Sequence, residues 1–416
     1  MSTGFPLPEI GDILNEKYQV TRRIGAGAFG AIYECQNIEN GKLYAAKLEN
    51  PKSPSPQLNL EYKLYDLLDA APGIPRVYSY WTEDRFRGMI MDRLGMSLGY
   101  CFRICDKMLS LKTVAMCAIQ MLCRLEYLHQ RSFIHRDIKP DNFVFGVGNK
   151  SNTLYMIDLG LAKKYRDLHT FIHINYAEDK GLAGTARYVS INVHLGVEQS
   201  CRDDLESVGY VLISLVKGKL PWQGLETGSK NDKHDLLSQA KMDTPLETLC
   251  QGLPNEFLVY MTRVRNLRFD ERPAYTTLRG LFISMMVKMN FAFDYKYDWV
   301  VNRTTRLDNA LKSAGTAEKQ ETIIPIATNE LVGAKKLKNE GKNNCFWQPL
   351  PFFSMMNEAA RFVGLSKRGN NAGKKDESEN PKITFPKPQK MFLLDPKETQ
   401  LPKMPIQNIE FEHDVQ

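Results

Sequence analysis

The spacing of hydrophobic and polar positions changes from a strand-like to a helix-like period along the chain. Short β-rich runs come first, broken by a glycine turn and by Asn40-Gly41, and they span residues 18–24, 31–35 and 43–48. Runs of this kind are typical of an antiparallel sheet. Apolar residues then recur with a helical period, which predicts helices at about 58–68, 110–130, 203–217, 246–264 and 275–290. Strands with one helix, followed mostly by helices, predict an α+β fold in two lobes.

The regular spacing ends near residue 300. Residues 301–416 contain nine of the 21 prolines, with scattered Lys and Asn and no sustained period. Such a composition predicts a low-complexity, mostly disordered tail. One apolar run, Cys345–Phe353, interrupts the tail. It could dock a partner or carry a lipid on Cys345 beside basic segments, and it is equally well explained as an aromatic cluster in an unstructured chain.

Composition narrows the class of protein without naming a function. The chain of 416 residues is 43% hydrophobic and 25% charged, which is ordinary for a soluble globular protein. Its eight cysteines are scattered, without a Cys-x-x-Cys pair, which argues against a zinc site or disulfide framework and favours a reducing compartment. No apolar run has transmembrane length, and residues 1–17 lack the pattern of a signal peptide. We therefore expect a soluble intracellular protein, whose mild net charge of +7 suits either an acidic partner or a solvated lysine-rich surface.

The candidate chemistry centres on the run Phe133–Asn142. It carries Asp137, Lys139 and Asn142, at offsets of 0, +2 and +5. Phosphoryl transfer uses these three types of group: a carboxylate for the proton of the nucleophile, a cation for the γ-phosphate and an oxygen ligand for Mg²⁺. Polar loops with Asp, Asn and Pro are also common turns. The spacing, however, matches the catalytic loop of protein kinases.

A glycine-rich loop precedes this run. Gly25–Gly30 reads Gly-x-Gly-x-x-Gly, a pattern shared by dinucleotide-binding folds and ordinary hairpins. Here a strand-like run follows the loop, whereas a dinucleotide-binding loop would open a helix. Lys47 lies on the next predicted strand and Glu61 on the following helix. The glycines would let the backbone cover phosphates, with Lys47 neutralising them and Glu61 holding Lys47 as an ion pair.

A second acidic candidate follows the catalytic run. Asp158 ends the apolar run 154–157 and is followed by Leu159-Gly160. This arrangement fits the metal-binding Asp-Phe-Gly turn, with Leu159 in the place of the phenylalanine. Asp158 and Asn142 would then hold Mg²⁺ through oxygen atoms, the ligands that this hard cation prefers.

Further motifs identify a family. The chain closely resembles the casein kinase 1 family of eukaryotic serine/threonine protein kinases over residues 17–300. Most kinases have Ala-Pro-Glu where this chain has Ser190-Ile191-Asn192, and that replacement is characteristic of the family. Together with His194-Leu195-Gly196, it favours this family over the related tau-tubulin kinases. The matching segments are Leu161–Tyr165, Gly184–Tyr188, Ser190–Asn192, His194–Gly196, Asp203–Ser207 and Leu220–Gly224.

The resemblance implies a bilobal kinase fold. An N-terminal extension (1–17) would precede a protein kinase domain (18–300), and the tail (301–416) would follow it. Within the domain we expect a small β-rich N-lobe at about 18–91, a hinge at 92–95 and a larger helical C-lobe at about 96–300. ATP and Mg²⁺ would bind in the cleft between the lobes.

The resemblance also assigns roles to residues. Asp137 would be the catalytic base, Lys139 would contact the γ-phosphate, and Asn142 and Asp158 would bind Mg²⁺. Thr185 would contact Asp137 and Lys139, and Asp204 would be buried and accept hydrogen bonds from the catalytic-loop backbone. The residues expected around ATP are Ile24, Gly25, Gly27, Gly30, Ile32, Ala45, Lys47, Glu61, the gatekeeper Met91, Asp92 and Leu94 of the hinge, and Val144.

The substrates implied by the resemblance are acidic or already phosphorylated proteins. Arg187, Lys230 and Lys233 match the family's anion-binding positions, where a guanidinium or an ammonium can hold a phosphate. Asp232 dilutes the basic run, and Cys201 stands where an arginine is usual. Substrate choice is therefore expected to differ from that of better-known members.

An alternative function is a pseudokinase that binds partners without catalysis. Pseudokinases usually lose the strand lysine, the catalytic aspartate or the metal aspartate, and this chain keeps Lys47, Asp137 and Asp158. We therefore expect an active, monomeric signalling enzyme of the cytoplasm or nucleus, with protein substrates and no nucleic-acid partner.

Overall fold

The structure, a computed structural model, describes residues 7–27, 30–225 and 230–301. The predicted disordered tail and the apolar run Cys345–Phe353 lie outside these residues. Among the described residues, no helix combines the length and the apolar character needed to cross a membrane.

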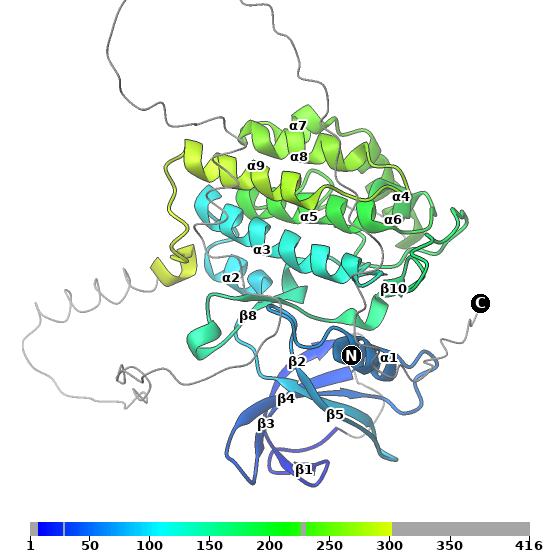
Figure 1. The fold of residues 1–416 in the computed structure, drawn as a ribbon, viewed down its shortest axis with the longest axis vertical. Coiled ribbons are helices and arrows are strands. Elements are labelled where there is room, and N and C mark those ends of the chain that lie inside the picture. The colour runs from blue at the N-terminus through cyan, green and yellow to red at the C-terminus, as the bar shows by residue number, and fades with distance from the viewer. Residues whose placement is uncertain (1–6, 28–29, 226–229, 302–416) are drawn as a thin grey trace, which may run out of the picture. The chain divides into compact units, whose positions relative to one another are not determined.

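The N-terminal region is an antiparallel sheet, as the strand-like spacing predicts (Figure 1). Its strands run in the order β1-β2-β3-β4-β6-β5. They are β1 (Ile13–Leu14), β2 (Tyr18–Gly27), β3 (Gly30–Asn37), β4 (Leu43–Glu49), β5 (Val77–Thr82) and β6 (Arg87–Asp92). The first helix, α1 (Leu58–Leu67), buries Leu58, Leu64 and Tyr65 in the same core cluster as Met89 and Met91 of β6. The sheet thus carries the glycine loop and Lys47, and α1 carries Glu61.

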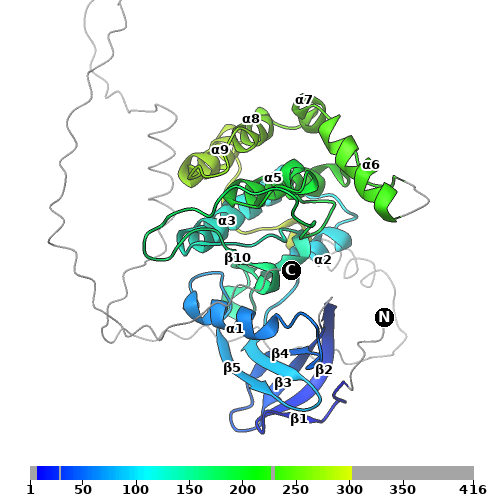
Figure 2. The same ribbon diagram turned by 90° about the vertical axis from the view of Figure 1, so that its right-hand side faces the viewer.

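The second region is mostly helical, again as predicted. Its helices are α2 (Leu98–Ile104), α3 (Leu111–Gln130), α4 (Ile191–His194), α5 (Cys201–Lys217), α6 (Lys230–Met242), α7 (Leu246–Cys250), α8 (Asn255–Arg265) and α9 (Tyr275–Lys288). Helices α3 and α5 lie side by side in the interior, with α9 over α3 and α8 over α5 (Figure 2). Because their buried side chains share one core cluster, these two helices form a rigid base for the loops that precede α5.

The single helix predicted over 246–264 is wrong. The structure has two helices there, α7 and α8, separated by a turn. Gly252 lies in this turn with a φ of +78°, a backbone conformation that side chains other than glycine rarely adopt. Pro254 then takes the cap position before α8. The apolar spacing continues across this turn because both helices pack on the same core.

Short strands frame the run Phe133–Asn142. Before it, β7 (Phe133–Ile134) pairs with β10 (Lys163–Lys164), and after it, β8 (Phe143–Phe145) pairs with β9 (Leu154–Met156). The run itself ends in a short 3₁₀ helix, Pro140–Asn142. Because β9 leads directly to Asp158, the β8–β9 hairpin brings the two candidate metal ligands to the same end of the hairpin.

Two glycines of the loop differ in the space around them. A Cβ at Gly30 would lie 1.7 Å from the backbone oxygen of Leu48, so β3 and β4 could not keep their pairing. A Cβ at Gly25 would meet only the Ile32 side chain, at 3.7 Å, which is an ordinary contact.

We predict that Gly30→Ala lowers the free energy of unfolding by about 1–3 kcal/mol and Gly25→Ala by less than about 0.5 kcal/mol. Urea denaturation of both variants tests this, and equal losses would contradict it.

Candidate active site

Both carboxylate oxygens of Asp137 are hydrogen-bonded. Thr185 donates its hydroxyl to Oδ1 at 2.7 Å, as the resemblance implies, and Lys139 Nζ donates to Oδ2 at 2.5 Å. The amide nitrogen of Asn142 donates to the Asp137 backbone carbonyl at 2.8 Å and to Oδ2 at 3.2 Å. Lys139 and Asn142 of the same loop, together with the distant Thr185, therefore fix the Asp137 side chain in one orientation.

The backbone before Asp137 is held by Asp204, as expected. The Asp204 carboxylate accepts hydrogen bonds from the backbone N–H groups of His135, at 2.7 Å, and Arg136, at 2.9 Å. It also lies 2.8 Å from His129 Nε2. Burial raises the pKa of Asp204, and His129 with the backbone donors outweighs burial, so the pKa lies below its usual range. These bonds stabilise Arg136 at a φ of +66°, which an arginine rarely adopts.

Lys47 is joined to two carboxylates. Its Nζ lies 2.6 Å from Glu61 Oε2 and 2.8 Å from Asp158 Oδ1, so the predicted ion pair with Glu61 is present and a second one is added. Burial lowers the pKa of Lys47, but the two carboxylates outweigh this effect and hold it above its usual value. The Asp158 backbone N–H donates to the Tyr65 hydroxyl at 2.9 Å. Lys47 thus connects β4, α1 and the turn after β9.

The apolar residues expected around ATP occupy neighbouring strands. Ala45 on β4 lies opposite Met91 on β6 and both are buried, as is Val144 on β8. Ile32 on β3 is half-buried opposite Lys47, and Ile24 on β2 is 42% exposed. Gly25 and Gly27 lie on β2 and Gly30 begins β3. The exposed side chain of Ile24 is one that a bound base could cover.

Two residues of the predicted hinge, Asp92 and Arg93, are hydrogen-bonded to the sheet or to the residue that precedes β5. Glu34 of β3 accepts hydrogen bonds from Arg22, at 2.9 and 3.0 Å, and from Arg93 of the hinge, at 2.9 Å. Hydrogen bonding to Arg22, opposed by burial and assisted by Arg93, lowers the pKa of Glu34 to about 2. Among the described residues, the backbone N–H of Leu94 has no hydrogen-bond partner, whereas that of Gly95 donates to the Phe145 carbonyl at 2.7 Å. Leu94 can therefore offer its N–H to a ligand.

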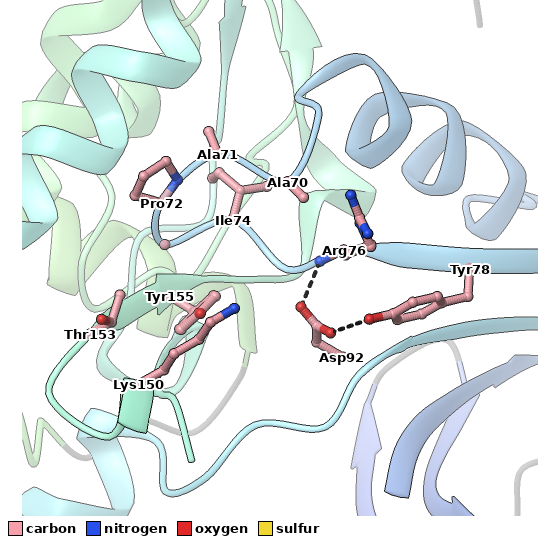
Figure 3. Close-up of a pocket in the computed structure, with 11 residues that line it drawn as sticks. Ala70, Ala71, Pro72, Ile74, Arg76, Tyr78, Asp92, Lys150, Thr153 and Tyr155 are labelled. Atoms are coloured by element: carbon pink, nitrogen blue, oxygen red, sulfur yellow. Dashed lines mark hydrogen bonds between the residues drawn. The ribbon is translucent and has the colours of Figure 1, made fainter. Parts of the chain in front are cut away.

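A cavity of about 460 Å³ adjoins Asp92 of the predicted hinge. Figure 3 shows Asp92 at one end of it, where the carboxylate accepts hydrogen bonds from the Arg76 backbone N–H, at 3.0 Å, and the Tyr78 hydroxyl, at 2.7 Å. Lys150 and Tyr155 lie at the other end. The Asp92 carboxylate is hydrogen-bonded to Arg76 and Tyr78. Only the backbone of Asp92 is therefore available to a nucleotide.

The oxygen ligands that Asn142 and Asp158 offer fit Mg²⁺. The amide nitrogen of Asn142 donates to Asp137, so its amide oxygen is the atom that can coordinate a cation. The pKa of Asp158 is raised by burial and lowered more strongly by Lys47, so this carboxylate is ionised at neutral pH. Among the described residues, no group of three or more His, Cys, Asp and Glu side chains is arranged so that it could hold a metal ion. Two oxygen ligands suit Mg²⁺, which keeps waters and substrate phosphates in its shell.

The three residues expected to bind an anion are described unequally. Arg187 is exposed, stacks over the Tyr188 ring at 5.7 Å, and has no ion pair within the described parts of the chain. Its backbone carbonyl accepts a hydrogen bond from Trp222 Nε1 at 2.9 Å. Lys230 and Lys233 lie on the first turns of α6, and their side chains lie outside the described part of the structure.

Sequence reasoning missed three residues that organise these groups: Glu34, His129 and Lys241. Glu34 has no motif around it, since its partners come from another strand and from the hinge. His129 faces Asp204 from the end of α3, where the apolar spacing indicated only a helix. Lys241 lies in the polar segment 230–242, so its burial has no signal in the sequence.

A comparison with protein-family models adds one finding. The model described as the protein kinase domain matches residues 18–278, which is more than half of the chain.

Glu34→Gln tests the fastening of the hinge through its pH dependence. A carboxyl whose pKa is lowered on folding contributes stability above its unfolded pKa, near 4.5, and loses it as the pH falls through about 2. Because solvent screens its arginine partners, we expect a loss of only about 1–2 kcal/mol of unfolding free energy at pH 7. Chemical denaturation from pH 2 to 7 should show the gap between the two proteins closing toward pH 2. A gap independent of pH would contradict this.

Proposed function

The chain belongs to the protein kinase family, and from this premise we propose that it is an active serine/threonine kinase of the casein kinase 1 type. It would transfer the γ-phosphoryl group of ATP to Ser or Thr of acidic or already phosphorylated proteins. Protein kinase domains generally use ATP and Mg²⁺. The observation that carries the proposal is the fixed carboxylate of Asp137, together with the ion pairs that join Lys47 to Glu61 and Asp158.

In the proposed reaction, the substrate hydroxyl forms a bond to the γ-phosphorus while the bond from that phosphorus to the β-phosphate oxygen breaks. Asp137 orients the hydroxyl and accepts its proton. Lys139 compensates charge on the transferred group, and Lys47 compensates charge on the α- and β-phosphates. Mg²⁺, held by Asn142 and Asp158, would neutralise the charge that develops on the β- and γ-phosphates.

The local structure of Ser190 supports the casein kinase 1 subtype. Ser190 caps α4 by accepting a hydrogen bond from the Val193 N–H at 3.2 Å, and its hydroxyl donates to Asp203 Oδ1 at 2.6 Å. The family-characteristic Ser190-Ile191-Asn192 therefore forms a specific contact with α5. An Ala at position 190 could make neither bond, so this packing depends on the residue that distinguishes the family from most kinases.

Asp137→Asn separates an active kinase from the alternative, a pseudokinase. The amide can occupy the space of the carboxylate but cannot accept the proton, so we expect turnover on casein to fall about 10²–10⁴-fold. ATP binding should stay nearly unchanged. Asp141→Asn is the matched control, because Asp141 is an exposed carboxylate of the same loop that pairs with Arg103 at 3.3 Å. Incorporation of labelled phosphate gives the rates, and near-normal turnover of the Asp137 variant would overturn the assignment.

Substrate preference is tested with Arg187→Ala combined with Lys233→Ala. Losing two charged contacts to an anion should lower kcat/KM at least about tenfold for a peptide with a phosphoserine upstream of the target. The KM for ATP should stay within about twofold, since only substrate binding is removed.

The control for this experiment is Arg268→Ala, which removes an arginine whose side chain is 78% exposed and forms an ion pair with Asp270. A peptide without the phosphate should lose much less rate in the double variant. If both peptides lose equally, the two residues do not read the anion.

A further inference from the structure

Lys241, on α6, is completely buried. Its ammonium donates hydrogen bonds to the backbone carbonyls of Ala186, at 2.8 Å, and Val189, at 2.6 Å, and lies 3.0 Å from His194 Nε2. Lysine side chains are almost never fully buried unless they are paired with an acid. The partners of Lys241 are instead two main-chain oxygens of one short segment and the His194 ring.

No carboxylate forms an ion pair with Lys241 within the described residues. The ammonium stands over the rings of Tyr210, at 5.2 Å, and Trp222, at 5.4 Å. Glu206 of α5 and Arg265 of α8 both act on the Lys241 ammonium electrostatically, and they pair with each other at 3.5 Å. Burying a cation without an anion is unfavourable. An apolar side chain of similar length would fill the same space without this cost, so packing alone does not explain the lysine.

The segment bound by Lys241 contains two residues of the proposed site. Thr185, at its start, donates its hydroxyl to Asp137. Arg187, in its middle, has an exposed guanidinium that forms no ion pair with a described residue, and its carbonyl accepts a hydrogen bond from Trp222. The Thr185 carbonyl accepts hydrogen bonds from the N–H groups of Tyr188, at 2.8 Å, and Val189, at 3.1 Å. Lys241 thus binds the carbonyls of residues 186 and 189, and Trp222 binds the carbonyl of residue 187.

We propose that Lys241 is a positioning residue for the protein substrate. By binding the carbonyls of Ala186 and Val189, it fixes the turn that presents Arg187 to the anionic group of the substrate and Thr185 to Asp137. This proposal rests on the proposed kinase function and adds to it a residue that touches neither substrate nor nucleotide. Its effect is expected on the binding of the protein substrate, and not on the binding of ATP.

The experiment compares Lys241→Met with Lys217→Met in the full chain. Lys217 is the matched control because its ammonium also donates to a backbone carbonyl, that of Leu249 at 2.7 Å, which belongs to α7 and not to the segment 185–189. We expect Lys241→Met to raise the KM for a phosphorylated peptide about tenfold and the KM for ATP less than twofold. Lys217→Met should leave both constants within twofold. Equal effects of the two variants on the peptide KM would overturn the proposal.

Two measurements that do not need catalysis separate this proposal from the kinase function. In Lys241→Met, amide hydrogen exchange should become faster at residues 184–190 than in Lys217→Met, and unchanged exchange there would overturn the proposal. Binding of the same phosphorylated peptide, measured by fluorescence anisotropy, should weaken selectively in the Lys241 variant. If the wild-type chain transfers no phosphate, but amide exchange and peptide binding change as expected in Lys241→Met, the kinase function is wrong and the positioning role of Lys241 is supported.

A pH dependence gives an independent signature of the buried ammonium. Burial lowers the pKa of Lys241 to about 7, Glu206 opposes this shift and Arg265 adds to it, with His194 and Tyr210 the other titratable groups that face it. The folded protein then releases this proton near pH 7, while the unfolded chain keeps it up to about pH 10.5. The stability of the wild type should therefore rise from pH 7 to 10 relative to Lys241→Met, and parallel stability curves would contradict the burial of a titrating amine.

Discussion

The site depends on buried carboxylates in the first turns of α5. Asp204 accepts the backbone N–H groups before Asp137, Asp203 accepts the hydroxyl of Ser190 and the N–H of Ser200, and Glu206 accepts the N–H of Ile191 at 3.3 Å. Buried charges of this kind are stable only when their oxygens are hydrogen-bonded. Burial raises the pKa of Asp203 to about 6, against the effect of the hydrogen bonds from Ser190 and Ser200. One helix, α5, therefore fixes the positions of the loop before Asp137 and of the start of α4 relative to each other.

The residues that we propose to face the substrate are organised mostly through the main chain. Lys241 and Trp222 bind carbonyls of 186–189, and Asp204 binds N–H groups of 135–136. Side chains that bind backbone fix the direction of a whole segment, and not only of one residue. The exposed residues on these segments, above all Arg187, are then free to present their charged ends to a partner.

The sequence predicts the parts of this protein whose information is local. Long apolar spacing indicated α3, α5 and α9, and motif spacing identified Asp137 and Asp158 in loops and Lys47 on a strand. The strands β5 and β6 and the helix α6 were not predicted, because their patterns are short or polar. Glu34 and Lys241 could not be found from sequence, since their partners are distant in the chain or are backbone atoms that every residue carries. The break between α7 and α8 was missed because Gly252 was not recognised as the left-handed residue of a turn.

The fastening of the predicted hinge has a mechanical consequence. Asp92 is bound to Arg76 and Tyr78 and Arg93 to Glu34, so both residues move with the sheet, while Gly95 is bound to Phe145 and moves with β8. Leu94 is the one residue between these two attachments. A rotation of the sheet relative to the helical region would therefore change the backbone torsions of Leu94. The Leu94 N–H that is open to a ligand therefore lies at the junction between a segment held by the sheet and a segment held by β8.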